Sequence, residues 1–168
     1  MNESIEEPSL AYIALQVQRG RSNEVVDDVR ALAGVTYAGY AVGTLDVLAK
    51  IEAKDIRSLI RLITQIGRSP GVLKTTTYLV VEGGKSKERE KQVGGIMFAT
   101  AYTTANYSQL VERLAQHDSV NSVSLVLGEY DLIVEIVGKT LPEIRNAIRS
   151  IQEKEKEIVS TNTVPVLE

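Results

Sequence analysis

The residues of this 168-residue chain that suit chemistry are few, and their types narrow the reactions open to it. Cysteine is absent, which excludes disulfides, thiolate metal sites and cysteine nucleophiles and suits a reducing cytosol. His117 is the single histidine, so no site built on two histidines can form, and its place before an Asp-Ser pair predicts an exposed side chain. Two of the remaining carboxylates stand in a repeated setting, Gly43-Thr44-Leu45-Asp46 and Gly128-Glu129-Tyr130-Asp131.

Composition limits the partners of the chain. The formal net charge is −3, so no general basic surface for nucleic acid is expected, and aromatic residues make up only 5%, too few for base-stacking platforms. No apolar run approaches the roughly 18 residues that a membrane span needs, and the first residues are acidic and polar, unlike a secretory signal. We therefore expect a soluble, cytoplasmic protein with no metal, no cofactor and no direct nucleic-acid or membrane binding.

A fixed shift of 85 positions relates the two halves of the chain, taking Gly43 to Gly128 and Asp46 to Asp131. The shift runs without a gap from about residue 10 to the C-terminus, with apolar positions falling on apolar positions. Other identities at this shift are Ala14 with Ala99, Val35 with Val120, Ile51 with Ile136 and Thr76 with Thr161.

This periodicity predicts a duplication, the alternative being two unrelated α/β segments of similar pattern. The expected domains are residues 10–82 and residues 96–168. The residues between them, 83–95, read GGKSKEREKQVGG, where paired glycines bracket a charged stretch typical of an exposed linker.

Each half is expected to fold as β-α-β-β-α-β. Ser22 or Asn23 is a plausible N-cap of the first helix, and Asp55 of the second. Pro142 suits the first turn of the last helix, where a missing N–H costs little. The expected strands are residues 11–17, 35–42, 47–51, 73–81, 96–102, 120–127, 132–137 and 158–167.

This order of elements predicts an α+β fold of two tandem ferredoxin-like units. In each unit, both helices should cover one face of a four-stranded antiparallel sheet. The strands are apolar on both faces, as in Leu132–Val137, and a bare apolar face costs roughly 25 cal/mol per Å². We therefore expect the two units to pack sheet to sheet within one chain, as a covalent pseudo-dimer.

The Gly-x-Tyr-Asp sequence between two apolar strands resembles the effector-binding (RAM) domain of the Lrp/AsnC family of regulators. Residues 128–131 match this motif in full, whereas Leu45 replaces the tyrosine in the first half. Pro70-Gly71-Val72 followed by Thr75-Thr76-Thr77 resembles a second family feature, which is weaker in the second half. Family regulators carry an N-terminal DNA-binding helix-turn-helix, and only about ten residues precede the first expected strand here, so specific DNA binding by this chain alone is not expected.

The resemblance implies that a small effector, typically an amino acid, binds near the Gly-x-Tyr-Asp turn and the threonine strand. Asp46 and Asp131 would accept the ammonium, and backbone N–H groups at Gly43 and Gly128 would approach closely. The other ligand-binding candidates are Asp55, Thr75, Thr77, Tyr130, Ser160 and Asn162. Because the halves differ at these positions, at most one set need bind, and a composite site between halves or chains stays open.

A purely structural role for the same residues is the alternative. Glycine supplies the positive φ of a tight hairpin, and aspartate caps a turn through its side chain. The threonine run has high strand propensity, and Tyr130 suits packing.

The favoured function is a stand-alone effector-binding protein that senses an amino acid or similar molecule. It would modulate assembly or transcription by associating with DNA-binding family regulators or by forming a homo-oligomer, with a tetramer expected. The alternatives are an enzyme on a duplicated ferredoxin-like scaffold and a non-binding assembly protein. Because His117 has no matched copy in the other half, the sequence predicts that the chain is not an enzyme.

Overall fold

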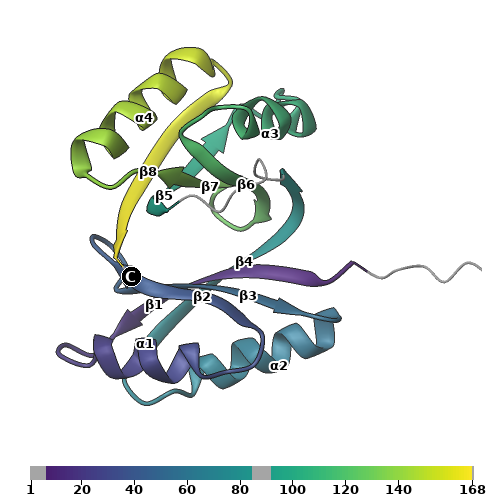
Figure 1. The fold of residues 1–168 in the computed structure, drawn as a ribbon. Coiled ribbons are helices and arrows are strands. Elements are labelled where there is room, and N and C mark those ends of the chain that lie inside the picture. The colour runs from purple at the N-terminus through teal and green to yellow at the C-terminus, as the bar shows by residue number, and fades with distance from the viewer. Residues whose placement is uncertain (1–6, 85–91, 168) are drawn as a thin grey trace, which may run out of the picture. The chain divides into compact units, whose positions relative to one another are not determined.

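The computed structural model describes residues 7–84 and 92–167. The chain divides into two compact units, the first ending at Leu79 and the second running from Val80 to Leu167, which we call the first and second repeat. Each repeat has two helices on one face of an antiparallel sheet (Figure 1). The predicted α+β fold of two tandem ferredoxin-like units is confirmed, and their packing sheet to sheet stays a prediction.

The sheet of the first repeat has the strand order β4-β1-β3-β2, because β1 pairs with both β3 and β4 while β2 pairs with β3. Its core lies between this sheet and the two helices, and contains the fully buried side chains of Ile13, Leu15, Val26 and Leu59. The elements are β1 (Ser9–Val17), α1 (Ser22–Arg30), β2 (Val35–Ala41), β3 (Val47–Ala53), α2 (Ile56–Gly67) and β4 (Val72–Gly84), of which residues 72–79 belong to this repeat.

The second repeat has the equivalent order β8-β5-β7-β6, also antiparallel throughout. Met97, Leu110, Leu114 and Val134 are fully buried in its core between helices and sheet. The elements are β5 (Val93–Ala101), α3 (Tyr107–Ala115), β6 (Val120–Leu127), β7 (Leu132–Val137), α4 (Leu141–Lys154) and β8 (Ile158–Leu167).

Side-chain caps start three of the four helices in the described residues. Asp55, Asn106 and Thr140 each accept a hydrogen bond from a backbone N–H three residues later, at α2, α3 and α4. The prediction for α1 is wrong, because the helix begins at Ser22 and its N-cap is Arg21, which makes no capping bond through its side chain. Arg21 instead pairs with Glu24 in the first turn, at 2.7 Å.

The repeats do not match at one constant shift, and the prediction of a gapless 85 is wrong at the outer strands. The N–H of Asp46 donates to Leu15 O, whereas the N–H of Asp131 donates to Ala99 O, so Ala99 corresponds to Leu15 and not to Ala14. The physical reason is loop length: four residues join β1 to α1, and five join β5 to α3. Between these ends, the helix caps and the middle strands keep the shift of 85.

The last strands are offset in the opposite sense. Leu15 pairs with Thr75 in the first repeat, and Ala99 pairs with Thr161 in the second, so Thr161 corresponds to Thr75 and not to Thr76. One extra residue between the start of α4 and the start of β8 causes this offset. The second repeat therefore carries its own Thr-x-Thr sequence, at residues 161–163.

The residues of the predicted linker fall into three parts. Residues 83–84 belong to β4, Gln92 and β5 (from Val93) make up the end of the linker, and residues 85–91 lie outside the described residues. The domain limits of 10–82 and 96–168 stay a prediction. Among the helices that the structure describes, none combines the length and the apolar character needed to cross a membrane.

Candidate effector site and its surroundings

The two Gly-x-x-Asp segments form the hairpin turns between the middle strands of each repeat. Gly43 has a φ of +136° and Gly128 a φ of +149°, values that residues with a Cβ rarely adopt. Ala41 N–H donates to Asp46 O, and Val126 N–H donates to Asp131 O, each at 2.9 Å, which closes the hairpins. The predicted role of glycine in a tight turn is confirmed.

The two aspartates bind a neighbouring strand and do not cap their own turn. Asp46 Oδ2 accepts the N–H of Val17 at 2.8 Å, and Asp131 Oδ2 accepts the N–H of Ala101 at 2.9 Å. The predicted local cap is therefore wrong, because the donors lie 29 and 30 residues away in sequence. Within the described part of the chain, the second oxygen of each carboxylate accepts no hydrogen bond.

Tyr130, Ser160 and Asn162 come together on one face of the second sheet. Met97 and Ala99 face the helices, so the alternate residues of β5 and their partners on β8 face the other way. Asn162 Nδ2 donates to Tyr130 Oη at 3.4 Å, and the hydroxyls of Thr100 and Ser160 lie 2.6 Å apart. The ring of Phe98 lies 5.2 Å from that of Tyr130. We call these five residues the Tyr130 cluster: Phe98, Thr100, Tyr130, Ser160 and Asn162.

The matching positions of the first repeat hold different chemistry. Counted with the strand offsets above, they are occupied by Ala14, Gln16, Leu45, Lys74 and Thr76. Thr75 and Thr77, which were candidates for binding, pair with Leu15 and Ile13 and so lie on the face that the helices cover. These two threonines therefore lie on the opposite sheet face from the positions that match the Tyr130 cluster.

Asp55 lies far from the Gly43–Asp46 turn. Asp46 precedes β3 and Asp55 follows it, and the seven residues of that strand span about 20 Å. Its Oδ1 accepts the N–H of Ser58 at 2.7 Å, and this backbone hydrogen bond, with a second from the Ser58 side chain, lowers the pKa of the Asp55 carboxyl. Asp55 is thus the cap of α2, as predicted, and lies at the opposite end of β3 from the Gly43–Asp46 turn.

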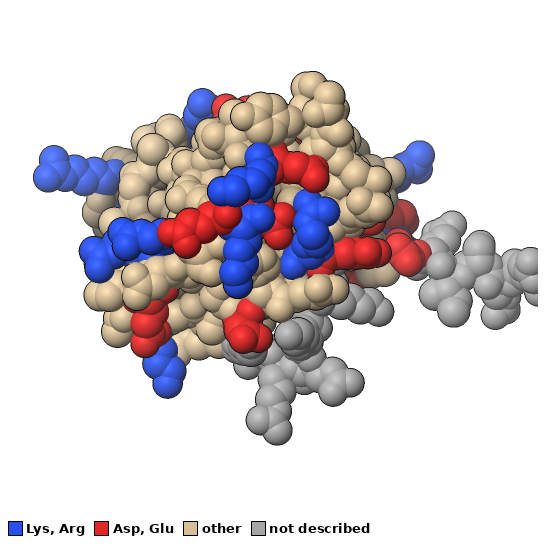
Figure 2. Space-filling model, turned by 90° about the horizontal axis from the view of Figure 1, so that it is seen from above, with Lys and Arg blue, Asp and Glu red and all other residues tan. Residues whose placement is uncertain are grey.

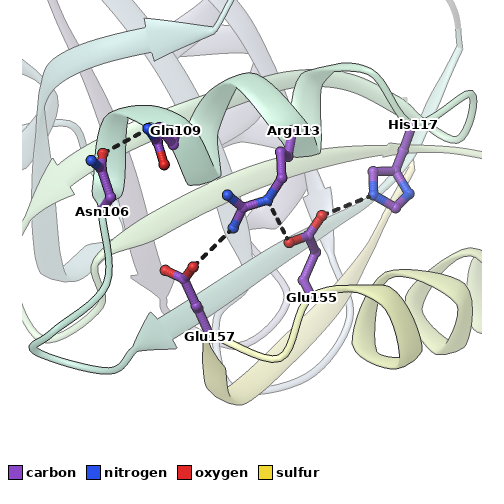
Figure 3. A network of polar contacts seen from close by, with 6 residues as sticks. All are labelled: Asn106, Gln109, Arg113, His117, Glu155 and Glu157. Atoms are coloured by element: carbon purple, nitrogen blue, oxygen red, sulfur yellow. Dashed lines mark hydrogen bonds and ion pairs between the residues drawn. The ribbon is translucent and has the colours of Figure 1, made fainter.

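A network of charged side chains joins α3 to the segment before β8 (Figure 3). Arg113 Nε lies 3.2 Å from Glu155 Oε2, its Nη2 lies 3.2 Å from Glu157 Oε1, and His117 Nε2 lies 3.4 Å from Glu155 Oε1. The hydrogen bond to Glu155 raises the pKa of the Arg113 guanidinium. We call these four residues the ion cluster: Arg113, His117, Glu155 and Glu157.

Sequence reasoning missed the ion cluster. The predicted exposure of His117 is wrong, since 10% of its side chain is accessible, and only 7% of the Glu155 side chain is accessible. One signal was present in the sequence. Arg113 and His117 are four residues apart near the end of α3, a spacing that puts both side chains on one side of the helix. Their partners come about 40 residues later, so the pairing was not readable from local sequence.

Three of the grooves in the described part of the chain lie within single repeats. The largest of these three, about 840 Å³, runs between α3 and α4 and is lined in part by Arg113, His117 and Glu155. The others measure about 520 Å³ beside α4 and about 570 Å³ in the first repeat. None of the ten predicted ligand-binding residues lines any of these three grooves.

The surface and the titratable groups add two observations. Lysine and arginine side chains are interleaved with aspartate and glutamate on the face seen in Figure 2, with no broad area of one sign. Within residues 7–84 and 92–167, no group of three His, Asp or Glu side chains is placed to hold a metal ion.

The sequence matches a known family in both repeats. The model of the Lrp/AsnC ligand binding domain matches residues 10–89 and residues 97–168. FFRP-DM1, a solved structure, is 26% identical over 44% of this chain and 99% of that chain, with a TM-score of 0.42. Among curated proteins, none matches.

Two solved structures are similar over nearly the whole chain. The siroheme decarboxylase NirDL, in co-complex with an iron-uroporphyrin III analogue, is 13% identical with a TM-score of 0.73, covering 99% of this chain and 73% of that chain. Chlorite dismutase from Candidatus Nitrospira defluvii, in complex with imidazole, is 9% identical with a TM-score of 0.63, covering 96% and 91%. At these identities the likeness shows the fold.

The prediction that the chain is not an enzyme is wrong. It was drawn from the single histidine, yet the fold of this chain, over nearly its full length, is one on which a siroheme decarboxylase and a chlorite dismutase are built. The fold and the histidine count therefore do not separate binding proteins from enzymes here.

Proposed function

Because the chain belongs to the Lrp/AsnC ligand-binding domain family, which matches both of its repeats, we propose that it senses an amino acid or a similar small zwitterion. The regulatory, effector-binding role follows from the family. The class of effector rests on the groups that the second repeat gathers around Tyr130.

The Tyr130 cluster is the observation that carries this proposal. A zwitterion needs donors for its carboxylate and an acceptor for its ammonium. The amide of Asn162 and the hydroxyl of Ser160 are donors on one sheet face, within reach of the adjacent turn. The Asp131 carboxylate is held at one oxygen by Ala101 N–H, which orients the other oxygen to accept an ammonium. The ring of Phe98 is buried and packs beside the ring of Tyr130, which supports the position of the tyrosine.

The first repeat is the weaker candidate for the same chemistry. Leu45 removes the phenol, Ala14 removes the aromatic ring, and Lys74 brings a cation where the second repeat has Ser160. We therefore assign binding to the second repeat alone. In this proposal Gly43 and Asp46 maintain the fold of the first repeat.

Assembly is the proposed output. An effector that binds one arrangement of subunits more tightly than another shifts the population toward it. We propose that the chain forms a homo-oligomer in the cytoplasm and that the effector changes its assembly or its association with DNA-binding regulators of the family.

Thermal unfolding with a panel of amino acids tests the proposal. A ligand at about 100 times its Kd stabilises the native state by about 2.7 kcal/mol, which raises Tm by several degrees. Asn162→Ala and Tyr130→Leu should abolish this rise, whereas Thr76→Ala, the matched change in the first repeat, should leave it intact. If no amino acid raises Tm at millimolar concentration, or if an iron porphyrin binds where amino acids do not, the proposal is wrong.

A further inference from the structure

The groove of about 520 Å³ beside α4, which we call the α4 groove, combines apolar and cationic side chains. Its volume falls in the range of about 300–1,000 Å³ that is usual for small-molecule sites. Residues of α4 and β8 line it, and it lies on the face of the second sheet that the helices cover. The Tyr130 cluster lies on the other face, so the sheet separates the α4 groove from the proposed effector site.

The side of the α4 groove nearest the core is apolar. Ile144 is buried and Ile148 is half-buried, and both line the groove from α4. From β8, Thr163 pairs with Met97, which belongs to the core beneath the helices. Side chains alternate along a strand, so Thr163 and Pro165 both face α4. The inner side of the groove therefore offers apolar surface to a ligand, apart from the threonine hydroxyl.

The α4 groove extends along most of the helix. Leu141, the first residue of α4, lines it and is 66% exposed. Gln152 lines it near the other end of α4, where its Nε2 donates to Thr161 Oγ1 at 2.8 Å and joins the helix to β8. At a rise of 1.5 Å per residue, these two residues are about 16 Å apart along the helix. The groove therefore suits a ligand with an extended apolar chain.

Two cations, Arg145 and Arg149, line the α4 groove on its solvent side. Each follows an isoleucine of the inner side by one residue, and both are exposed. They are four residues apart on α4, a spacing at which like charges repel and destabilise a helix. Within residues 7–84 and 92–167, neither guanidinium makes an ion pair or a hydrogen bond. An anion bound at this edge of the groove would remove the repulsion.

The first repeat shows that the fold does not need these two charges. The helix caps keep the shift of 85, so Ile60 and Thr64 of α2 occupy the positions that match the two arginines. The first repeat does have an arginine pair with the same spacing, Arg57 and Arg61, but neither residue lines any of the three grooves described above. Of these two arginine pairs, only the one on α4 lies beside an apolar groove.

We propose that the α4 groove binds an aliphatic carboxylate, such as a medium-chain fatty acid. The carboxylate lies between Arg145 and Arg149, because guanidinium groups form strong, charge-assisted hydrogen bonds with carboxylates. The aliphatic chain lies against Ile144 and Ile148 and loses its contact with water, which favours longer chains. This inference does not rest on the proposed function, because it uses no residue of the Tyr130 cluster.

The first test compares ligands on the full chain. Calorimetric titration with octanoate should show one bound molecule per chain, and octanol, which has the same chain length without the charge, should bind about tenfold more weakly. From hexanoate to octanoate to decanoate, the affinity should rise about threefold for each added methylene. In NMR spectra, octanoate should shift the methyl signals of Ile144 and Ile148. Equal affinities for octanoate and octanol, or no octanoate binding at millimolar concentration, would overturn the inference.

The second test compares two matched pairs of substitutions. The double variant Arg145→Gln/Arg149→Gln should weaken octanoate binding about tenfold, since it removes two exposed ion pairs. Its Tm should not fall, because both side chains are exposed and unpaired among the described residues. The control, Arg57→Gln/Arg61→Gln, removes the same charge from α2 and should leave the Kd unchanged. An equal loss of affinity in both double variants, or none in either, would contradict the assigned site.

A third variant separates this inference from the proposed function. Asn162→Ala alters the Tyr130 cluster and should leave octanoate binding unchanged. If no amino acid binds the chain but octanoate binds as described, the proposed function fails and this inference stands. If amino acids raise Tm and octanoate does not bind, this inference fails and the proposed function stands.

Discussion

The carboxylate of Asp131 and the backbone N–H of Ala101 are joined by a hydrogen bond of 2.9 Å, and Asp46 makes the same bond, at 2.8 Å, to Val17. Each bond connects the turn between the two middle strands to the end of the first strand of its repeat. Both repeats have kept it, although they differ at most of the surrounding positions. This relationship gives the aspartates a structural role in both repeats, beside the ligand role proposed for Asp131.

Removing either carboxylate should therefore destabilise the chain. Asp46→Ala leaves the N–H of Val17 without its charged acceptor, and a hydrogen bond to a charged group contributes about 2 kcal/mol. Asp131→Ala should cost a similar amount. Urea unfolding followed by circular dichroism measures both. A loss at Asp131 with none at Asp46 would contradict a shared structural role.

The turn glycines make a separate prediction. Gly43 has no neighbouring atom within 4 Å of an added Cβ, so Gly43→Ala should cost about 1 to 2 kcal/mol from its positive φ alone. Gly67, in α2, is the control: its added Cβ would make an ordinary contact of 3.8 Å with Thr75, so Gly67→Ala should stabilise the chain slightly. Equal effects of the two changes on the free energy of unfolding would contradict this reading of the turn.

The cap of α2 should show in the acid response of the protein. The pKa of Asp55 is lowered in the folded chain from an ordinary value of 3.8. Its contribution to stability is therefore complete above about pH 4 and is lost as pH falls below that value. Asp55→Asn keeps an oxygen that accepts the Ser58 N–H but carries no charge, so the difference between wild type and variant should shrink from pH 6 to pH 3. Urea midpoints across this range measure it, and a difference that grows on acidification would refute the assignment.

Restoring the family tyrosine in the first repeat should not create a second site. Leu45→Tyr supplies a phenol, but Lys74 and Thr76 still stand where the second repeat has Ser160 and Asn162. Calorimetric titration with an amino acid that raises Tm should therefore give the same number of bound ligands per chain as the wild type. A doubled stoichiometry would show that the tyrosine alone limits binding in the first repeat.

The parts of the structure that were predictable from sequence are those that depend on neighbouring residues. The apolar periods and the turn residues gave the order of strands and helices, and Asp55 was correctly identified as a cap because its partner lies three residues away. The predicted constant shift of 85 is wrong at the outer strands, because a comparison at one offset cannot account for connections that differ in length between the two repeats. Thr161 was therefore matched with Thr76 when its counterpart is Thr75.

The candidate site was only partly predictable for a related reason. The sequence identifies both Tyr130 and Asn162 as candidate ligand-binding residues. Their contact, however, spans 32 positions in sequence and depends on which residues of β8 face the turn. Thr75 and Thr77 were chosen too, and the pairing of β4 with β1 turns them toward the helices. The ion cluster was not predicted, because the partners of Arg113 and His117 lie about 40 residues later in the sequence.

Leu32 of the first repeat and His117 of the second occupy matching positions, but Leu32 makes an apolar contact and His117 belongs to the ion cluster. The two contacts should therefore differ in how they depend on salt concentration. Added salt weakens attraction between accessible charges, and 42% of the Arg113 side chain and 37% of the Glu157 side chain are accessible. The leucine contact in the other half does not weaken in this way. We therefore expect added salt to weaken the contact between α3 and the segment before β8, and to leave the contact of Leu32 with the core of the first repeat unchanged.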